Sequence, residues 1–176
     1  MCATPRTSPK CLAMADPGPG ERVAVRPAVV DDVPHILDIN ALAGRSGGTA
    51  ESMHRAIEDE GRLVLVATSG DAVIAWAKTH YWDHTDRLAP AGQYLGGITV
   101  DPLWRRQRVA MELTQARLDW IRKRSSCAWY VVNAANQASI LLHHQWGFTE
   151  VTRAADFHGT TFAGGCGILM RAEFKK

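Results

Sequence analysis

Arginine side chains gather where a strand-like segment passes into a helical one, in the stretch YLGGITVDPLWRRQRVA at residues 94–110. The strand-like part ends at the Asp-Pro step of residues 101–102, and Arg105, Arg106 and Arg108 precede the helical pattern. A helix N-terminus carries free backbone N–H groups and the positive end of the helix dipole, which together bind phosphate. Guanidinium groups pair with phosphate oxygens in a bidentate manner. The stretch therefore predicts a site for an anionic, phosphate-bearing ligand.

The same stretch resembles the acetyl-CoA-binding motif of the GCN5-related N-acetyltransferases (GNAT). In that family a strand ending in Val-Asp-Pro is followed by Arg/Gln-x-x-Gly-x-Gly/Ala at the start of a long helix. Here Arg105, Arg108, Val109 and Ala110 occupy this frame. Arg108 replaces the family's first glycine, which usually allows the backbone to approach a pyrophosphate closely. The N–H of Arg108 can still donate to a phosphate when its side chain points away.

A second motif, at residues 136–148, resembles the family's Asn-x-x-Ala/Ser-x-x-x-Tyr-x-x-x-Gly-Phe. Four residues match it, namely Asn136, Ser139, Gly147 and Phe148. His143 takes the place of the tyrosine, which commonly protonates the departing CoA thiolate. The resemblance thus predicts this role for His143, because imidazole can donate a proton near neutral pH. On a helix His143 would share a polar stripe with Asn136 and Ser139, opposite an apolar face. The other interpretation is a helix-surface histidine without a role.

The resemblance implies that acetyl-CoA is the cofactor and that an amine attacks it directly in a ternary complex. The pantetheine arm would pair with a strand of the sheet as an additional β-strand would. A backbone N–H would polarise the thioester carbonyl. The expected cofactor-binding residues are Ile98, Thr99, Val100, Arg105, Arg106, Gln107, Arg108, Val109, Ala110, Asn133, Asn136 and Ser139. Neither Cys127 nor Cys166 is expected to act as a covalent nucleophile, and no metal is expected.

An attacking amine must be neutral, although a free alkylammonium has a pKa of about 10. Many family members carry a glutamate in the strand where this chain has Gly96 and Gly97. Paired glycines inside a strand mark a bulge or the close approach of another group, and here they would leave room for a bulky acceptor. The expected replacements for the carboxylate are water or the loop residues Asp83 and His84, followed by Asp156 and His158.

Aromatic residues are the expected walls of the acceptor pocket, namely Tyr81, Trp82, Tyr94 and Phe157. Aromatic walls with a few carboxylates suit an amine, so the predicted acceptor is a small molecule with a primary amine, such as an aminoglycoside antibiotic. A protein lysine or N-terminus is the alternative acceptor. A CoA-binding sensor without catalysis is the alternative of another class. A homodimer is an open option, because dimers are common in the family.

Local patterns predict the elements that must position these residues. Strands are expected at residues 22–26, 63–67, 73–77, 94–100, 128–132, 148–154 and 162–171. Helices are expected through residues 34–39, after a cap at Asp31 or Asp32, and at residues 49–60, 105–124 and 137–146. Residues 80–93 are expected to form a loop. This order predicts an α/β fold with a mixed sheet of about six to seven strands and about four helices, which is the GNAT fold. Its central strands should be parallel, because a helix connects them.

Composition limits the class of protein. The 176 residues suit one domain, predicted at residues 21–176 after a flexible Pro/Gly-rich tail at residues 1–20. A net charge of +2 gives little support for nucleic acid as a partner. The four cysteines lack CxxC spacing, which argues against a disulfide scaffold or a zinc site. With neither a membrane-length apolar run nor a secretory leader in view, a cytoplasmic enzyme is expected.

Overall fold

The computed structural model describes residues 22–45 and 48–174, so the predicted tail at residues 1–20 lies outside the described part. The strands of the main sheet are β1 (Val23–Pro27), β2 (Val64–Ser69), β3 (Ala72–Trp82), β4 (Gly92–Val100), β5 (Cys127–Asn133), β6 (Thr149–Ala154) and β9 (Gly167–Glu173). Two short strands, β7 (Asp156–Phe157) and β8 (Thr160–Thr161), form a separate hairpin. The helices are α1 (Val33–Leu42), α2 (Ala50–Glu58), α3 (Val109–Arg122) and α4 (Gln137–His144), with 3-10 turns at Val30–Asp32 and Pro102–Trp104.

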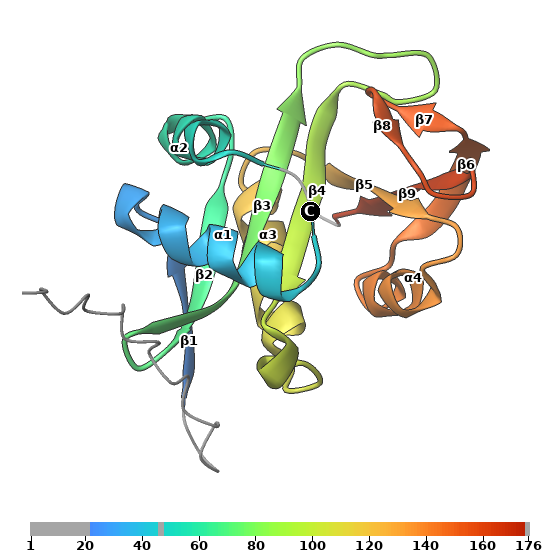
Figure 1. Ribbon diagram of the computed structural model, residues 1–176. Helices are drawn as coiled ribbons and strands as arrows, with labels where there is room; N and C mark the ends of the chain where they lie inside the picture. The colour runs from blue at the N-terminus through green and yellow to red at the C-terminus, as the bar shows by residue number, and fades with distance from the viewer. Residues whose placement is uncertain (1–21, 46–47, 175–176) are drawn as a thin grey trace, which may run out of the picture.

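The main sheet has seven strands in the order β1-β2-β3-β4-β5-β9-β6 (Figure 1). Adjacent strands in this sheet are antiparallel, except for β4 and β5. These two run parallel because α3 connects the end of β4 to the start of β5. The predicted mixed sheet and its parallel centre are therefore confirmed. The strands β2 and β3 pair antiparallel as a hairpin.

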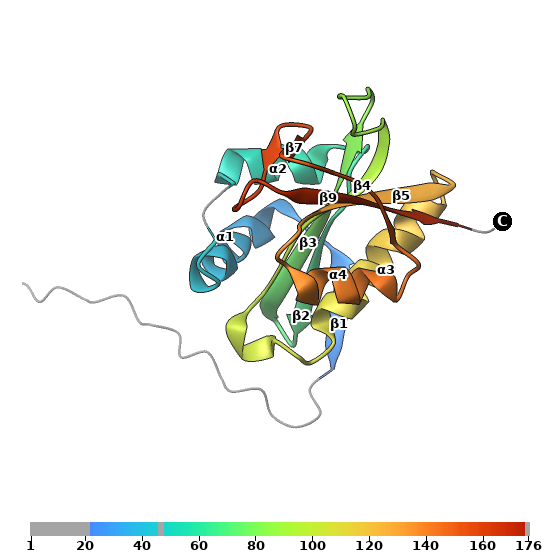
Figure 2. The same ribbon diagram turned by 90° about the vertical axis from the view of Figure 1, so that its right-hand side faces the viewer.

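Helices cover both faces of this sheet, with α1 and α2 on one side and α3 and α4 on the other (Figure 2). Successive residues of a strand point to opposite faces, which explains how β2 serves both layers. Val64 and Val66 pack in the cluster formed with α1 and α2, whereas Leu65 and Ala67 pack in the cluster formed with α3. No helix within the described residues is long and apolar enough to cross a membrane.

Both early helices begin where the sequence predicted. Asp32 immediately precedes α1, and its carboxylate accepts a hydrogen bond from the Val29 N–H at 2.8 Å and pairs with Arg26 at 2.7 Å. Thr49 caps α2, because its hydroxyl accepts a hydrogen bond from the Ser52 N–H at 3.1 Å. These contacts fix the ends of the layer that lies over β2 and β3.

The central strands are longer than predicted, so some candidate site residues expected in a loop lie on strands. The pairing of β3 with β4 continues through Trp82↔Gly92, so residues 80–82 and 92–93 belong to strands and only the segment between them is a loop. Aromatic and imidazole side chains suit such a ladder, because each can pack on one face of a pleated surface. Tyr81 and Trp82 are therefore strand residues, held in register against β4.

Three helices are shorter than predicted, and α2 ends at Glu58, two residues before the predicted end. The predicted helix at residues 105–124 begins only at Val109, because the backbone of Arg106 and Arg108 has positive φ angles of 62° and 64°. Such angles interrupt a right-handed helix. The helix α4 ends at His144, two residues before the predicted Trp146. The last predicted strand begins at Gly167 instead of residue 162, after the β7–β8 hairpin.

Candidate functional site

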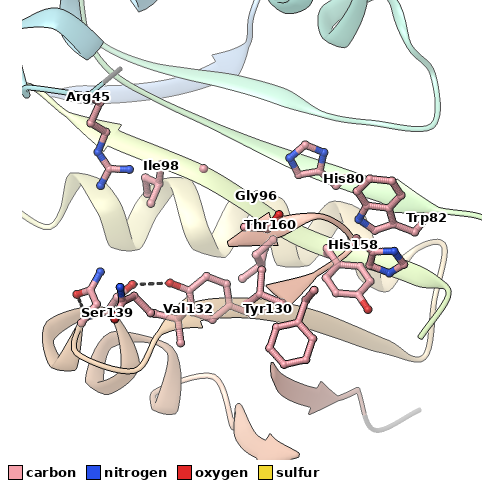
Figure 3. Close-up of a pocket in the computed structure, with 17 residues that line it drawn as sticks. Arg45, His80, Trp82, Gly96, Ile98, Tyr130, Val132, Ser139, His158 and Thr160 are labelled. Atoms are coloured by element: carbon pink, nitrogen blue, oxygen red, sulfur yellow. Dashed lines mark hydrogen bonds between the residues drawn. The ribbon is translucent and has the colours of Figure 1, made fainter. Parts of the chain in front are cut away.

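The two parallel strands at the centre of the sheet part from each other. The strands β4 and β5 pair only at Tyr94↔Trp129 and Leu95↔Tyr130. Beyond this point β4 continues along β3 while β5 continues along β9. A cavity of about 290 Å³ lies where they diverge (Figure 3). Its lining residues are Arg45, His80, Trp82, Tyr94, Leu95, Gly96, Gly97, Ile98, Tyr130, Val131, Val132, Asn133, Asn136, Ser139, Phe157, His158 and Thr160.

A β-bulge shapes the β4 side of this cavity. The register passes from Ala77↔Ile98 to Thr79↔Leu95, so Gly96 and Gly97 together lie opposite the single residue between Ala77 and Thr79. A Cβ atom at position 96 would lie 2.7 Å from Cδ2 of His80. The expected bulge is therefore confirmed for the glycine pair, and the expected close approach of another group is confirmed at Gly96.

A buried arginine on α3 supports the bulge. Arg117 is 0% exposed, and its Nη1 donates to the carbonyl oxygens of Lys78 and Gly96, both at 3.1 Å. Its other nitrogens donate to Leu113 O at 3.3 Å and Thr114 Oγ1 at 2.9 Å. Burial lowers the pKa of Arg117 to about 10. The guanidinium thus ties β3, β4 and α3 together at the point where the strand bulges.

Arg117 is not among the predicted site residues, although the sequence carries a signal for it. The residue lies four positions after Leu113 and four before Ile121, both fully buried, so helical periodicity places it on the inward face of α3. A charged residue at such a position requires several hydrogen-bond acceptors nearby.

Polar groups of α4 face β5 in a buried layer. The hydroxyl oxygens of Tyr130 and Ser139 are 2.6 Å apart (Figure 3). The imidazole of His143 stacks on the Tyr130 ring with centroids 3.9 Å apart, and its Nδ1 lies 2.7 Å from the Ser139 carbonyl oxygen. His143 is 1% exposed and does not line the cavity, whereas Tyr130 does. Burial lowers the pKa of His143 to about 4 and raises the pKa of Tyr130.

The expected orientation of α4 is therefore corrected. Ser139 and His143 face the core, where the Ser139 hydroxyl bonds with Tyr130 and His143 Nδ1 lies against the Ser139 carbonyl, while the enclosed Nε2 of His143 has no partner among the described residues. Leu141, on another face of the helix, is 65% exposed. The physical reason is that the Tyr130 hydroxyl and the Ser139 carbonyl supply hydrogen-bond partners inside the core for the Ser139 hydroxyl and for His143 Nδ1.

The structure places the other predicted side chains in different surroundings. Asp83 and His84 pair with each other at 2.8 Å on the exposed connection after β3, and neither lines the cavity. The carboxylate of Asp156 pairs with Arg87 at 2.7 Å and also lies outside the lining. Tyr81 is 47% exposed and is not a lining residue.

An aromatic wall closes the end of the cavity where β4 and β5 still pair. Trp82 stacks on His158 with centroids 4.4 Å apart, and Tyr94 meets the same imidazole edge-on at 5.4 Å. Phe157, on β7, is buried behind them. The structure thus brings Trp82, Tyr94 and Phe157 together in the lining of one cavity, with His158 from the β7–β8 hairpin. Trp82 and His158 are more than seventy residues apart in the sequence, so only the tertiary fold brings them into contact.

The predicted asparagines lie at the end of the cavity nearest α4. The Asn133 amide donates to Ala163 O at 2.8 Å and its oxygen accepts from the Ala135 N–H at 2.8 Å. The Asn136 oxygen caps α4 by accepting from the Ser139 N–H at 3.2 Å. Asn133 therefore has both polar ends engaged within the chain, whereas no described residue accepts a hydrogen bond from the Asn136 amide.

A second cavity of about 290 Å³ lies at the start of α3. Its lining residues are Val100, Trp104, Arg105, Arg106, Arg108, Val109, Ala110, Met111 and Leu142. The side chains of the three arginines are exposed. Gln107 lies outside this lining and donates its amide to Leu103 O at 3.2 Å. Val100 is the last residue of β4, so both cavities are lined in part by this strand.

Free donors at this helix start fit an anionic group. Among the described residues, none accepts a hydrogen bond from the backbone N–H of Arg108, Val109 or Ala110. The backbone of Arg108 adopts a left-handed conformation as the N-cap of α3, which is the conformation that glycine adopts most readily. The arginine thus keeps the turn that a glycine would make, and its N–H remains available. The donors and guanidinium groups match a pyrophosphate.

Neither cavity is lined by a carboxylate of the described residues. Within residues 22–45 and 48–174, no group of three or more His, Cys, Asp and Glu side chains is arranged to hold a metal ion. Arg45 contributes the one charged guanidinium among the described residues that line the first cavity. The other polar groups of this lining are imidazole, indole, hydroxyl, amide and backbone groups.

Comparison with known proteins gives a consistent result. The family described as "Acetyltransferase (GNAT) family" matches residues 34–148. The ribosomal-protein-S18-alanine N-acetyltransferase of Escherichia coli is 23% identical with a TM-score of 0.71, covering 88% of this chain and 96% of its own. Ard1 of Thermoplasma volcanium is 16% identical, with a TM-score of 0.70 and coverages of 88% and 99%. YncA of Salmonella typhimurium, solved with its cofactor acetyl-CoA, is 19% identical, with a TM-score of 0.69 and coverages of 88% and 95%. No curated protein sequence matches the chain.

Proposed function

The chain belongs to the GNAT family of acetyltransferases, and from this premise we propose that it transfers the acetyl group of acetyl-CoA to the primary amine of a small molecule. It is an acetyl-CoA-dependent N-acetyltransferase by family. The observation that carries the proposal is the parting of β4 from β5, which opens one cavity beside the strand and leads along it to a second at the start of α3.

The residues present suit the cofactor. Acetyl-CoA, when bound, supplies an acetyl group on an activated thioester. The backbone of residues 98–100 would hold the pantetheine arm, as an added strand is held, because β4 no longer pairs with β5 there. The free N–H groups of Arg108, Val109 and Ala110 would hold the pyrophosphate, with the guanidinium groups around them.

A hydroxyl group is available where the leaving sulfur needs a proton. Tyr130 lines the cavity and keeps its proton over the neutral range, because burial raises its pKa. Our proposal therefore gives the donor role to the Tyr130 phenol. In this proposal His143 is not the proton donor but positions Tyr130. Its ring stacks on the phenol, and its Nδ1 forms a hydrogen bond with the Ser139 carbonyl. Proton donation from a placed side chain is worth about 10²- to 10⁴-fold in rate.

The lining favours one class of acceptor. An aminoglycoside carries several ammonium groups, and no carboxylate of the described residues lines the cavity to pair with them. Trp82, Tyr94 and Phe157 instead offer aromatic surface to an apolar body. We therefore place a monoamine with an aromatic or aliphatic body ahead of the polycationic acceptor that the sequence suggested.

Free-thiol release from acetyl-CoA over a panel of amines tests the proposal. The panel contains 2-phenylethylamine, an aminoglycoside, spermidine, a lysine peptide and a peptide with an N-terminal alanine. Turnover concentrated on the monoamine supports the proposal, whereas turnover confined to the peptides assigns a protein acceptor. Tight acetyl-CoA binding by calorimetry without thiol release from any amine would favour the sensor, and absence of binding would refute the function.

A further inference from the structure

The space beside Gly96 is filled by a side chain from the neighbouring strand. His80 lies on β3 opposite Tyr94, and its ring stands next to Gly96 at the cavity wall (Figure 3). A Cβ atom at position 96 would lie 2.7 Å from His80 Cδ2 and 3.0 Å from Lys78 Cγ. No side chain can therefore be carried by β4 at this point without displacing the imidazole. The glycine and the histidine form one arrangement, in which β3 supplies the functional group.

The imidazole of His80 is available to a ligand. Neither ring nitrogen has a hydrogen-bond partner among the described residues, and neither is among the fully enclosed polar atoms. The other lining histidine differs, because the Nε2 of His158 lies 3.2 Å from Pro90 O and its Nδ1 is enclosed. His80 is thus the lining histidine of the described chain whose nitrogens remain open to the cavity.

The surroundings keep this imidazole neutral. Burial is the main cause that lowers the pKa of His80 to about 4, and the charges of Lys78 and Arg62 act in the same direction. Around it, Lys78 lies on the same strand, Arg62 precedes β2, Tyr94 faces it from β4 and His158 stacks beyond Trp82. No carboxylate lines this cavity in the described part of the chain, so none offsets these charges. A neutral imidazole is a proton acceptor throughout the neutral range.

We propose that His80 is a catalytic residue, the base that receives the proton of the acceptor amine during acetyl transfer. The inference rests on the proposed function and adds to it the group that replaces the carboxylate absent at positions 96 and 97. The neutral amine nitrogen forms a bond to the acetyl carbon while the carbon–sulfur bond breaks. The N–H proton passes to His80, and the sulfur receives a proton from Tyr130. His80 then releases its proton to solvent and Tyr130 regains one, which restores the starting state.

Two substitutions of His80 test this role against a structural one. We expect His80→Gln to lower kcat about 10²-fold at pH 7.5, within the range for loss of a general base, while the affinity for acetyl-CoA by calorimetry changes less than about twofold. His80→Ala opens space beside Gly96. We expect added imidazole to raise the kcat of this variant at least about tenfold, because the free base can enter that space. The control is His35→Gln, at an exposed histidine of α1 that does not line the cavity, with no expected change.

A double-mutant cycle with Gly96→Ala tests the shared space. We expect Gly96→Ala to reduce kcat strongly in the wild-type background and much less in the His80→Ala background, because the added methyl group then meets no imidazole. Equal kcat for wild type and His80→Gln, or a loss that imidazole leaves unchanged in His80→Ala, would overturn the assignment while wild-type turnover still upheld the acetyltransferase. Failure of the wild-type enzyme to bind acetyl-CoA would remove both proposals.

Discussion

The hydroxyl groups of Tyr130 on β5 and Ser139 on α4 lie 2.6 Å apart at the wall of the cavity between the central strands. The His143 ring lies against the other side of the phenol, with ring centroids 3.9 Å apart. A strand therefore presents a hydroxyl at the cavity, while the histidine at the family's tyrosine position supports it from within the core. In the proposed mechanism Tyr130 is the proton donor and His143 is the residue that positions it.

Tyr130→Phe should lower kcat about 10²-fold if the phenol protonates the leaving sulfur. Acetyl-CoA affinity should stay nearly constant, because the ring and its stacking remain. Ser139→Ala is the matched variant, since it removes the hydrogen-bond partner and keeps the phenol, and its kcat should fall much less. Thiol-release kinetics and calorimetry measure both. If Tyr130→Phe turns over at the wild-type rate, the sulfur takes its proton elsewhere.

Arg117→Met should lower the free energy of unfolding by about 1–3 kcal/mol, because it leaves the carbonyls of Lys78 and Gly96 without a donor. Methionine fills similar volume and carries no charge, so the lost hydrogen bonds dominate the change. Lys123→Met, on an exposed residue just past α3, is the control and should change stability by less than about 0.5 kcal/mol. Urea denaturation gives both values. Equal stability of the two variants would show that the bulge does not depend on this guanidinium.

Arg108→Gly and Arg108→Ala should differ in stability although both remove the same charge. The backbone at position 108 has φ of 64°, which costs a residue with a Cβ about 1–2 kcal/mol. The glycine variant should therefore unfold at a higher temperature than the alanine variant. Both should bind acetyl-CoA about fivefold more weakly, the equivalent of about 1 kcal/mol for an exposed charge contact. Identical melting temperatures would mean that the left-handed turn relaxes without strain.

Acid should destabilise the protein between about pH 6.5 and pH 4. The pKa of buried His143 is lowered to about 4, below the ordinary value of about 6.5 that it regains on unfolding. In this window the unfolded chain binds more protons than the folded one, so stability falls as pH is lowered, by at most about 1.4 kcal/mol per pH unit for one histidine. His80 contributes in the same direction.

His143→Phe isolates this effect, because phenylalanine can stack on Tyr130 but does not titrate. Urea denaturation at pH 7.5 and pH 4.5 should give a smaller difference for this variant than for the wild type. His35→Gln, at an exposed position, should leave the difference unchanged. A wild-type difference that persists in full in His143→Phe would assign the acid sensitivity to other groups.

Much of the fold could be predicted because its signals are local. Alternating apolar residues indicated the strands, Thr49 indicated the start of α2, and the order of elements required a helix between parallel strands. The glycine pair at 96 and 97 indicated the bulge for the same reason, since the requirement for a missing Cβ is a property of the strand itself. The arginines before α3 predicted an anion site by their position alone.

The side chains that face one another across the cavity could not be predicted in this way. His80 meets Gly96 because β3 and β4 pair in a bulged register, and Tyr130 meets Ser139 and His143 because α4 packs on β5. Arg117 reaches the bulge only when α3 lies across those strands. The amino-acid sequence by itself therefore determined most of the elements and the bulge, which depend on neighbouring residues, and it predicted an anion site before α3. Only the tertiary structure decided which groups share the cavity, because pairing register and packing join positions that are distant along the chain.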